Sequence, residues 1–244
     1  YYKNGLNDVV NFILESKREY EEKIANIVDI PEKNAEAPNI SFECKCELDH
    51  VSYKYPSGEK EILSDASMVI PAGKSIGIVG ASGAGKSTVA DLLLGLLKPQ
   101  NGTVKSDGVN IEENYPSWLS HVGYIPQTIY MLDDNIRNNV AFGYNDKSIS
   151  DKRVWEALDE ACIGDFIRTL PEGLDTNIGE RGLRLSGGQR QRLGIARALY
   201  SAPEILVFDE ATSALDSQTE KEIIESIDNL HGKKTLVIIA HRIT

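Results

Sequence analysis

The chain has few cysteines and no long apolar run, and these two scarcities limit what it can be. It contains only Cys44, Cys46 and Cys162 among 244 residues. Three scattered cysteines are too few for a disulfide framework or a zinc cluster, so they indicate a reducing compartment. No stretch approaches the roughly 18 consecutive apolar residues of a membrane-spanning helix, and Tyr1 does not open a signal peptide. We therefore expect the chain itself to be soluble.

Positive charge is also scarce. The sequence has 26 Lys and Arg against 37 Asp and Glu, which gives a formal net charge of -11 at pH 7. Proteins that grip nucleic acid normally present a basic face that displaces counterions from phosphates, so this balance argues against nucleic acid as a partner. The apolar content of 41% is enough for a sizeable core in one domain or two closely joined lobes.

Residues 6–28 carry an amphipathic helical pattern. Apolar side chains recur there at intervals of three and four residues, and charged residues fill the other faces. Pro31 marks the end of the pattern, and the polar run over residues 32–38 is typical of a linker. Taken alone, the pattern is compatible with a surface or dimerisation helix outside the main domain.

Strand patterns follow the linker. Residues 40–70 alternate in hydropathy around a turn at residues 56–58, which predicts antiparallel hairpins. Short apolar runs at residues 75–79, 205–208 and 235–240 predict buried strands on either side of a helical middle. A mainly parallel sheet flanked by helices is the expected core, with a helix over residues 87–97.

A glycine-rich segment, Gly-Ala-Ser-Gly-Ala-Gly-Lys-Ser at positions 80–87, fits the phosphate-loop pattern G-x-x-x-x-G-K-[ST], also called Walker A. Its glycines let backbone amides approach a phosphate, and Lys86 adds a positive charge for the β- and γ-phosphates. The Ser87 hydroxyl would ligate Mg²⁺. The loop follows an apolar strand and opens a helix, which argues against a chance glycine-rich turn.

The apolar run at residues 205–208 ends in two acids, Asp209 and Glu210. Carboxylates delivered by the end of a buried strand can hold a metal ion and an attacking water. A pair of this kind is common in proteins and becomes informative only together with the other motifs.

The sequence Leu-Ser-Gly-Gly-Gln at positions 185–189 has no metal ligand or base of its own, but its glycines expose amides at the start of a helix. Together with the phosphate loop and the Asp-Glu pair, it resembles the ATP-binding domain of ABC transporters, an ATPase that works as a head-to-tail dimer. The resemblance covers residues 48–244. It implies an α/β fold: a P-loop NTPase (RecA-like) core with an antiparallel β subdomain and an α-helical signature subdomain over about residues 128–200, preceded by the amphipathic helix.

The resemblance also implies roles. ATP would be bound by the phosphate loop of one subunit and by Ser186 and Gly188 of the other. Asp209 would position Mg²⁺ and Glu210 would act as general base. The adenine would stack on Tyr55, although Tyr53 shares the strand face and is an alternative. The expected catalytic residues are Glu210, His241, Gln127 and Lys86; the nucleotide-binding residues are Tyr55, Gly80, Ser82, Gly83, Ala84, Gly85, Lys86, Ser87, Thr88, Ser186, Gly187, Gly188 and Gln189; and the Mg²⁺ ligands are Ser87, Gln127 and Asp209.

Two further segments narrow the resemblance to exporters. The turn at residues 179–182 is similar to an exporter segment that contacts the helices coupling to the membrane domain, and residues 213–216 resemble the loop that touches the opposite subunit. We interpret residues 1–37 as the cytoplasmic tail of a transmembrane helix in the same polypeptide, plus a linker. Residues 38–244 would form the ATP-binding domain at the cytoplasmic face of the cell membrane, without the final strands and helix expected after His241.

Other interpretations stay open at this point. Residues 122–136, with 92–97 before them, look like bacterial exporters of lipid-linked oligosaccharides or polysaccharides, while peptide, lipid and drug exporters are alternatives. A soluble ABC clamp acting on nucleic acid or ribosomes would show turnover stimulated by nucleic acid. A module that binds ATP without hydrolysis would lack the base, which is present as Glu210. A separate importer ATPase subunit would not need the helix over residues 6–28.

Overall fold

The computed structural model describes residues 37–56, 58, 60–209 and 217–240. Several predicted features lie outside these residues. They are the amphipathic helix over residues 6–28, the linker up to residue 36, Glu210, the loop at residues 213–216 and His241.

An antiparallel sheet forms one layer of the molecule. Its strands are β1 (Lys45–Lys54), β2 (Glu61–Pro71), β4 (Asn101–Ser106) and β5 (Val109–Asn110), in the order β2-β1-β4-β5. β1 and β2 form a long hairpin in which Leu48 pairs with Met68, which confirms the predicted antiparallel pairing. The β4–β5 hairpin was not predicted, although its turn residues Asp107 and Gly108 adopt the positive φ of 47° and 88° that tight hairpin turns require.

A parallel sheet forms the second β layer. Its strands are β3 (Ser75–Val79), β6 (Val122–Ile125), β7 (Ile205–Asp209) and β8 (Thr235–Ala240), in the order β3-β8-β7-β6. All three pairings are parallel, so the carboxyl ends of these strands meet at one edge. The apolar runs at residues 75–79, 205–208 and 235–240 are therefore strands, as predicted, and β7 and β8 are mostly buried. The prediction that residues 75–79 are buried is wrong: β3 lies at the end of this strand order, and its residues are exposed or of intermediate exposure.

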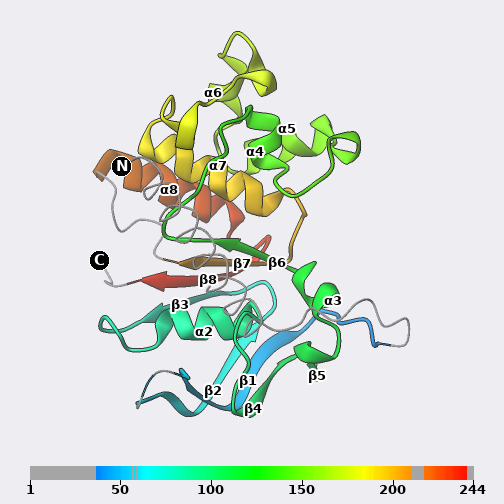
Figure 1. Cartoon of the computed structure of the whole chain (residues 1–244), viewed down its shortest axis with the longest axis vertical. Coiled ribbons are helices and arrows are strands. Elements are labelled where there is room, and N and C mark those ends of the chain that lie inside the picture. The colour runs from blue at the N-terminus through cyan, green and yellow to red at the C-terminus, as the bar shows by residue number, and fades with distance from the viewer. Residues whose placement is uncertain (1–36, 57, 59, 210–216, 241–244) are drawn as a thin grey trace, which may run out of the picture.

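Helices cover both faces of the parallel sheet (Figure 1). One helix, α2 (Lys86–Leu93), lies between the two sheets, and α3 (Tyr115–Leu119) precedes β6. On the opposite face lie α4 (Ile136–Val140), α5 (Asp151–Glu160), α6 (Gly164–Arg168), α7 (Gly187–Leu199) and α8 (Ser217–Leu230). Short 3-10 turns complete the described elements: η1 (Ile111–Glu113), η2 (Asp146–Ser148), η3 (Gly173–Asp175) and η4 (Glu180–Gly182).

Each face of the parallel sheet packs against a separate hydrophobic core. Leu206 and Phe208 of β7 point into the core shared with the helices α4 to α8. Ile205 and Val207, the alternate residues of the same strand, point into the core between the two sheets, which also contains Leu92 of α2. This alternation explains why β7 is apolar throughout: both of its faces are buried.

Helix α2 is shorter than expected. The sequence pattern predicts a helix to residue 97, whereas α2 ends at Leu93. Gly95 adopts the left-handed φ of 71°, its amide donates to the Leu92 carbonyl at 3.1 Å, and the Leu96 amide donates to the Asp91 carbonyl at 2.8 Å. These bonds form a Schellman motif, which stops the helix while the apolar run continues.

The segment that leads into β1 is fastened to the domain by side chains of later elements. The Asp107 carboxylate accepts hydrogen bonds from the amides of Glu43, Cys44 and Lys45, at 2.6, 3.0 and 2.8 Å. Ser117 of α3 accepts from the amide of Ile40 at 2.9 Å. The described chain is therefore anchored from its first few residues onward.

The three cysteines form no disulfide. Cys46 is buried in β1, and burial raises the pKa of its thiol to about 12, so it stays protonated at neutral pH. None of the helices in the described parts of the chain is both long and apolar enough to cross a membrane.

Candidate functional site

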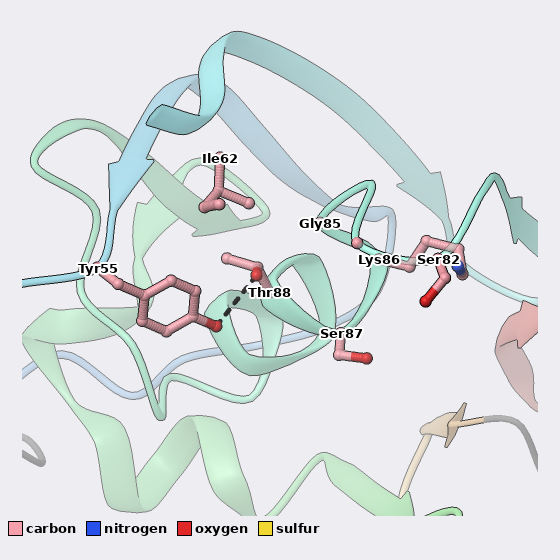
Figure 2. A pocket seen from close by; sticks show the side chains of 8 residues that line it. Tyr55, Ile62, Ser82, Gly85, Lys86, Ser87 and Thr88 are labelled. Atoms are coloured by element: carbon pink, nitrogen blue, oxygen red, sulfur yellow. Dashed lines mark hydrogen bonds between the residues drawn. The ribbon is translucent and has the colours of Figure 1, made fainter. Parts of the chain in front are cut away.

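A pocket of about 250 Å³ lies where the phosphate loop meets the β1–β2 hairpin (Figure 2). Seven of the predicted nucleotide-binding residues line it together with one residue of β2. The lining residues are Tyr55, Ile62, Ser82, Gly83, Gly85, Lys86, Ser87 and Thr88. The structure thus brings together side chains from three separate segments of the chain, as a nucleotide site needs.

Gly85 shapes the mouth of this pocket. It precedes α2 with a φ of 86°, and a Cβ at this position would come within 2.8 Å of Ile62 Cγ2. Both facts require glycine here. No side chain caps the N-terminus of α2, so the first amides of the helix keep their hydrogens for an anion. The geometry fits a phosphate group.

Lys86 is buried and lies across the loop. Its Nζ donates to the carbonyl oxygens of Gly80 and Ala81, at 3.0 Å in both cases. Only 7% of the residue is exposed. The ammonium group is therefore held close to the backbone that an anion would contact.

The structure distinguishes between Tyr53 and Tyr55, the two candidates for stacking on adenine. Tyr53 belongs to β1 and is 5% exposed inside the core, whereas Tyr55 is 37% exposed and lines the pocket. The Tyr55 hydroxyl lies 3.1 Å from Thr88 Oγ1, so the ring packs beside the first turn of α2 (Figure 2). Tyr55, rather than Tyr53, has a face available for a planar base.

A second group of predicted residues lies at the carboxyl edge of the parallel sheet. Asp209 ends β7, and Gln127 follows the neighbouring strand β6 by two residues. The Tyr124 hydroxyl donates to Asp209 Oδ2 at 3.3 Å. Burial raises the pKa of Asp91 on α2, and the negative charge of Asp209 adds to the rise.

The donors at this edge suit Mg²⁺. Ser87 offers a hydroxyl, Asp209 a carboxylate and Gln127 an amide oxygen, and hard divalent cations prefer oxygen ligands. Within the described ranges, no three residues among His, Cys, Asp and Glu gather as a metal cluster. A magnesium ion would therefore take its remaining ligands from phosphate and water, which is how Mg²⁺ usually binds beside a nucleotide.

The segment Leu-Ser-Gly-Gly-Gln at residues 185–189, called the signature here, lies elsewhere on the molecule. Ser186 caps α7: its hydroxyl oxygen accepts from the Gln189 amide at 3.2 Å, and Gln189 Oε1 accepts from the Ser186 amide at 2.8 Å. This is a capping box. Gly187 is exposed and Gly188 is buried. None of residues 186–189 lines the pocket at the phosphate loop.

Three residues near the site were missed by the sequence reasoning. Ile62 lies against Gly85, the Tyr124 hydroxyl donates to Asp209, and Asp91 on α2 has a pKa raised by burial and by the charge of Asp209. Tyr124 could have been noticed, because it lies on a strand that ends beside the predicted metal ligands. Ile62 and Asp91 carry no motif, and only the packing of β2 and α2 reveals them.

Comparison with known proteins agrees with this geometry. The family described as "ABC transporter" matches residues 63–213, more than half of the chain. ATP-binding cassette sub-family B member 10, mitochondrial, from Mus musculus is 42% identical over 207 residues, which cover 84% of this chain and 29% of that protein. An ATP-dependent lipid A-core flippase from Aliivibrio fischeri is 40% identical over 198 residues, or 81% of this chain and 34% of that protein.

A solved structure agrees as well. It is described as a bacterial Atm1-family ABC exporter with ATP bound, and it matches with a TM-score of 0.77 and 38% identity over 94% of this chain and 40% of that chain. The chain thus spans well under half the length of these relatives. Their shared family, the phosphate-loop pocket and the capped signature helix lead to one conclusion: the chain belongs to the ABC transporter family, as an ATP-binding ATPase domain.

Proposed function

We propose that this domain powers an ABC exporter by binding and hydrolysing Mg-ATP in a head-to-tail dimer. The observation that carries the proposal is the separation of two anion-binding helix starts within one chain. The phosphate loop and α2 form a pocket, and none of Ser186, Gly187, Gly188 and Gln189 lines it. A second ATP-binding domain would supply its own signature to each bound nucleotide, so that every ATP is enclosed by both subunits.

The cap on α7 supports this use of the signature. Ser186 accepts the Gln189 amide with an oxygen lone pair. Its hydroxyl hydrogen can then donate to the γ-phosphate of ATP on the partner domain, beside Gly187, which is exposed. ADP lacks that phosphate, so it would favour the closed dimer less than ATP does.

The remaining roles are assigned from the family motifs. We propose Asp209, Gln127 and Ser87 as Mg²⁺ ligands, Lys86 as the cation at the β- and γ-phosphates, and Glu210 as the general base. His241 would orient the water. When bound, Mg²⁺ would offset the charge of the phosphates. The protein's part is to hold these oxygen donors at the carboxyl edge of the sheet, next to the phosphate loop.

We also propose that a transmembrane domain belongs to the same polypeptide and that the ATPase domain lies at the cytoplasmic face of the cell membrane. The match to this chain covers 29%, 34% and 40% of the three relatives described above, and two of them are named as a flippase and an exporter. Among the cargoes that the sequence leaves open, the relative named lipid A-core flippase supports a lipid-linked saccharide or a lipid.

The test is the size and membrane behaviour of the natural polypeptide, followed with an antibody against this domain in alkali-washed membranes and in cytosol. We expect a product much heavier than the 26.9 kDa chain that stays in the membrane after the alkali wash. A product of about 26.9 kDa in the cytosol would contradict the fused exporter and favour a clamp ATPase or a separate importer subunit.

A further inference from the structure

Tyr124 contacts the residue that we assign to Mg²⁺. It lies on β6, the neighbour of β7, and its hydroxyl is 3.3 Å from Asp209 Oδ2. Its side chain packs against the core between the two sheets, on the same face as Val207 of β7. Asp209 follows Val207 by two residues and therefore shares that face. The contact comes from the register of two adjacent parallel strands.

The phenol is a stable donor in this position. The phenol of a tyrosine ordinarily loses its proton only near pH 10, so the hydroxyl is available as a donor at neutral pH. A protonated phenol next to a carboxylate can only donate to it, so the bond fixes one oxygen of the Asp209 side chain.

A hydrogen bond of this kind can orient a carboxylate that ligates a metal ion. Carboxylates that ligate metals are commonly oriented by hydrogen bonds from residues behind them, and loss of such a partner typically costs 10- to 100-fold in metal affinity or activity. Tyr124 occupies that place behind Asp209.

We infer that Tyr124 is a positioning residue that holds the Asp209 carboxylate in the orientation for Mg²⁺ beside the nucleotide. The inference rests on the proposed role of Asp209 as a metal ligand. It assigns the hydroxyl no contact with ATP or Mg²⁺ and no part in proton transfer.

The test compares ATP affinity in excess Mg²⁺ with ATP affinity in excess EDTA, on the full-length protein. In Tyr124→Phe we expect the gain in affinity from Mg²⁺ to shrink by about tenfold, while ATP affinity in EDTA changes by less than about twofold. Tyr115→Phe is the matched control. It removes the hydroxyl of a buried tyrosine that belongs to the same core and precedes β6, and it should leave both affinities unchanged.

Asp209→Asn separates this inference from the proposed function. If Asp209→Asn lowers the gain from Mg²⁺ and Tyr124→Phe does not, the positioning role is overturned while the metal site stands. If Asp209→Asn has no effect either, the metal assignment itself fails. Tyr124→Phe that weakens ATP equally with and without Mg²⁺ would indicate a packing role and would also overturn the inference.

A double variant gives a second, independent readout. With Asp209 already replaced by Asn, adding Tyr124→Phe should cause no further loss of the gain from Mg²⁺, because the two residues act through one contact. A further loss equal to that in the single variant would contradict the inference.

Discussion

Lys86 shows how one residue can be both buried and charged at a functional site. Its ammonium donates to the carbonyl oxygens of Gly80 and Ala81. A buried cation attracts an anion strongly, because the surrounding medium screens the charge less than water does. A phosphate in the adjacent pocket would provide that anion.

The first prediction at this scale is that Lys86→Ala weakens ATP binding about tenfold or more, since hydrogen bonds to charged groups contribute about 1.5–3 kcal/mol. Equilibrium binding of a fluorescent ATP analogue measures it. Lys98→Ala removes a lysine just beyond α2 that is paired with Glu112 on the surface, and it should bind ATP as the unmodified protein does. Unchanged affinity in Lys86→Ala would contradict the phosphate contact.

The second prediction concerns Glu210, which lies outside the described residues. Glu210→Gln should slow ATP hydrolysis by roughly 10²-fold or more, because loss of a general base typically costs 10²–10⁴-fold. ATP affinity should stay the same, since glutamine keeps the size of the side chain. Steady-state phosphate release and ATP binding, measured on one preparation, decide the matter: undiminished turnover would remove Glu210 from the mechanism.

Sequence motifs at the residue scale predicted which groups gather at the pocket, but not how they are held. Tyr55 and Tyr53 are equivalent in the alternating pattern, and only the burial of Tyr53 in the core separates them. The bond from Tyr124 to Asp209 depends on the register between β6 and β7, which no local pattern specifies.

At the scale of elements, the β4–β5 turn does more than join two strands. Asp107 has a φ of 47°, and its carboxylate collects three amides from the segment before β1. Burial would raise the pKa of this carboxyl, but hydrogen bonds from the amides of Glu43, Lys45 and Cys44 outweigh it and hold the pKa below the ordinary value. The β4–β5 turn thus binds the segment that leads into β1.

A third prediction follows, with a defined pH dependence. Asp107→Asn should lower the free energy of unfolding by about 1–2 kcal/mol at neutral pH, because an amide nitrogen cannot accept the bonds that one carboxylate oxygen makes. A carboxyl whose pKa is lower in the folded state stabilises above its unfolded pKa of about 3.9 and loses that effect as the pH falls through the folded pKa. The difference between the two proteins should therefore shrink as the pH falls below about 4 and disappear below the folded pKa.

Urea unfolding at several pH values measures this difference. Asp65→Asn is the matched control: Asp65 also has a positive φ, of 48°, but its carboxylate bonds the exposed side chain of His50. Asparagine tolerates the left-handed backbone at both positions. A stability difference for Asp107→Asn that stays constant down to pH 3 would contradict stabilisation by hydrogen bonds to the Asp107 carboxylate.

The elements themselves were predicted unevenly. Strands with both faces buried, such as β7 and β8, stand out as apolar runs and were found. β4 and β5 were missed, because their half-exposed residues and short lengths give little periodicity. The end of α2 was predicted too late, because Gly95 stops the helix within an apolar run that continues to Leu97.

At the scale of the whole molecule, the starts of α2 and α7, which we propose bind phosphate, belong to different layers. The pocket at α2 lies beside the two sheets, while α7 begins among the helices on the other face of the parallel sheet (Figure 1). None of residues 186–189 lines the pocket of its own chain, so we propose that they contact the ATP bound to a second domain. Dimerisation driven by ATP is therefore a property to be tested on the assembled protein.

The fourth prediction uses this arrangement. Ser186→Ala should weaken ATP-dependent dimerisation of Glu210→Gln protein about tenfold, by removing one charge-assisted hydrogen bond to each ATP, while ATP binding to the separate domain is unchanged. Analytical ultracentrifugation with and without ATP measures it. Ser150→Ala, which removes the equivalent cap from α5, is the control for helix capping alone. Equal weakening by both variants would point to a folding defect instead.

The sequence by itself determined the family and the α/β class, because the phosphate loop, the signature and the strand ending in Asp209 are local patterns with local physical causes. Only the tertiary structure decided which tyrosine faces the pocket, that Ile62 covers Gly85, and that Tyr124 supports Asp209. These contacts join residues far apart in the chain. They depend on strand register and on packing between layers, where many sequences satisfy the same local pattern.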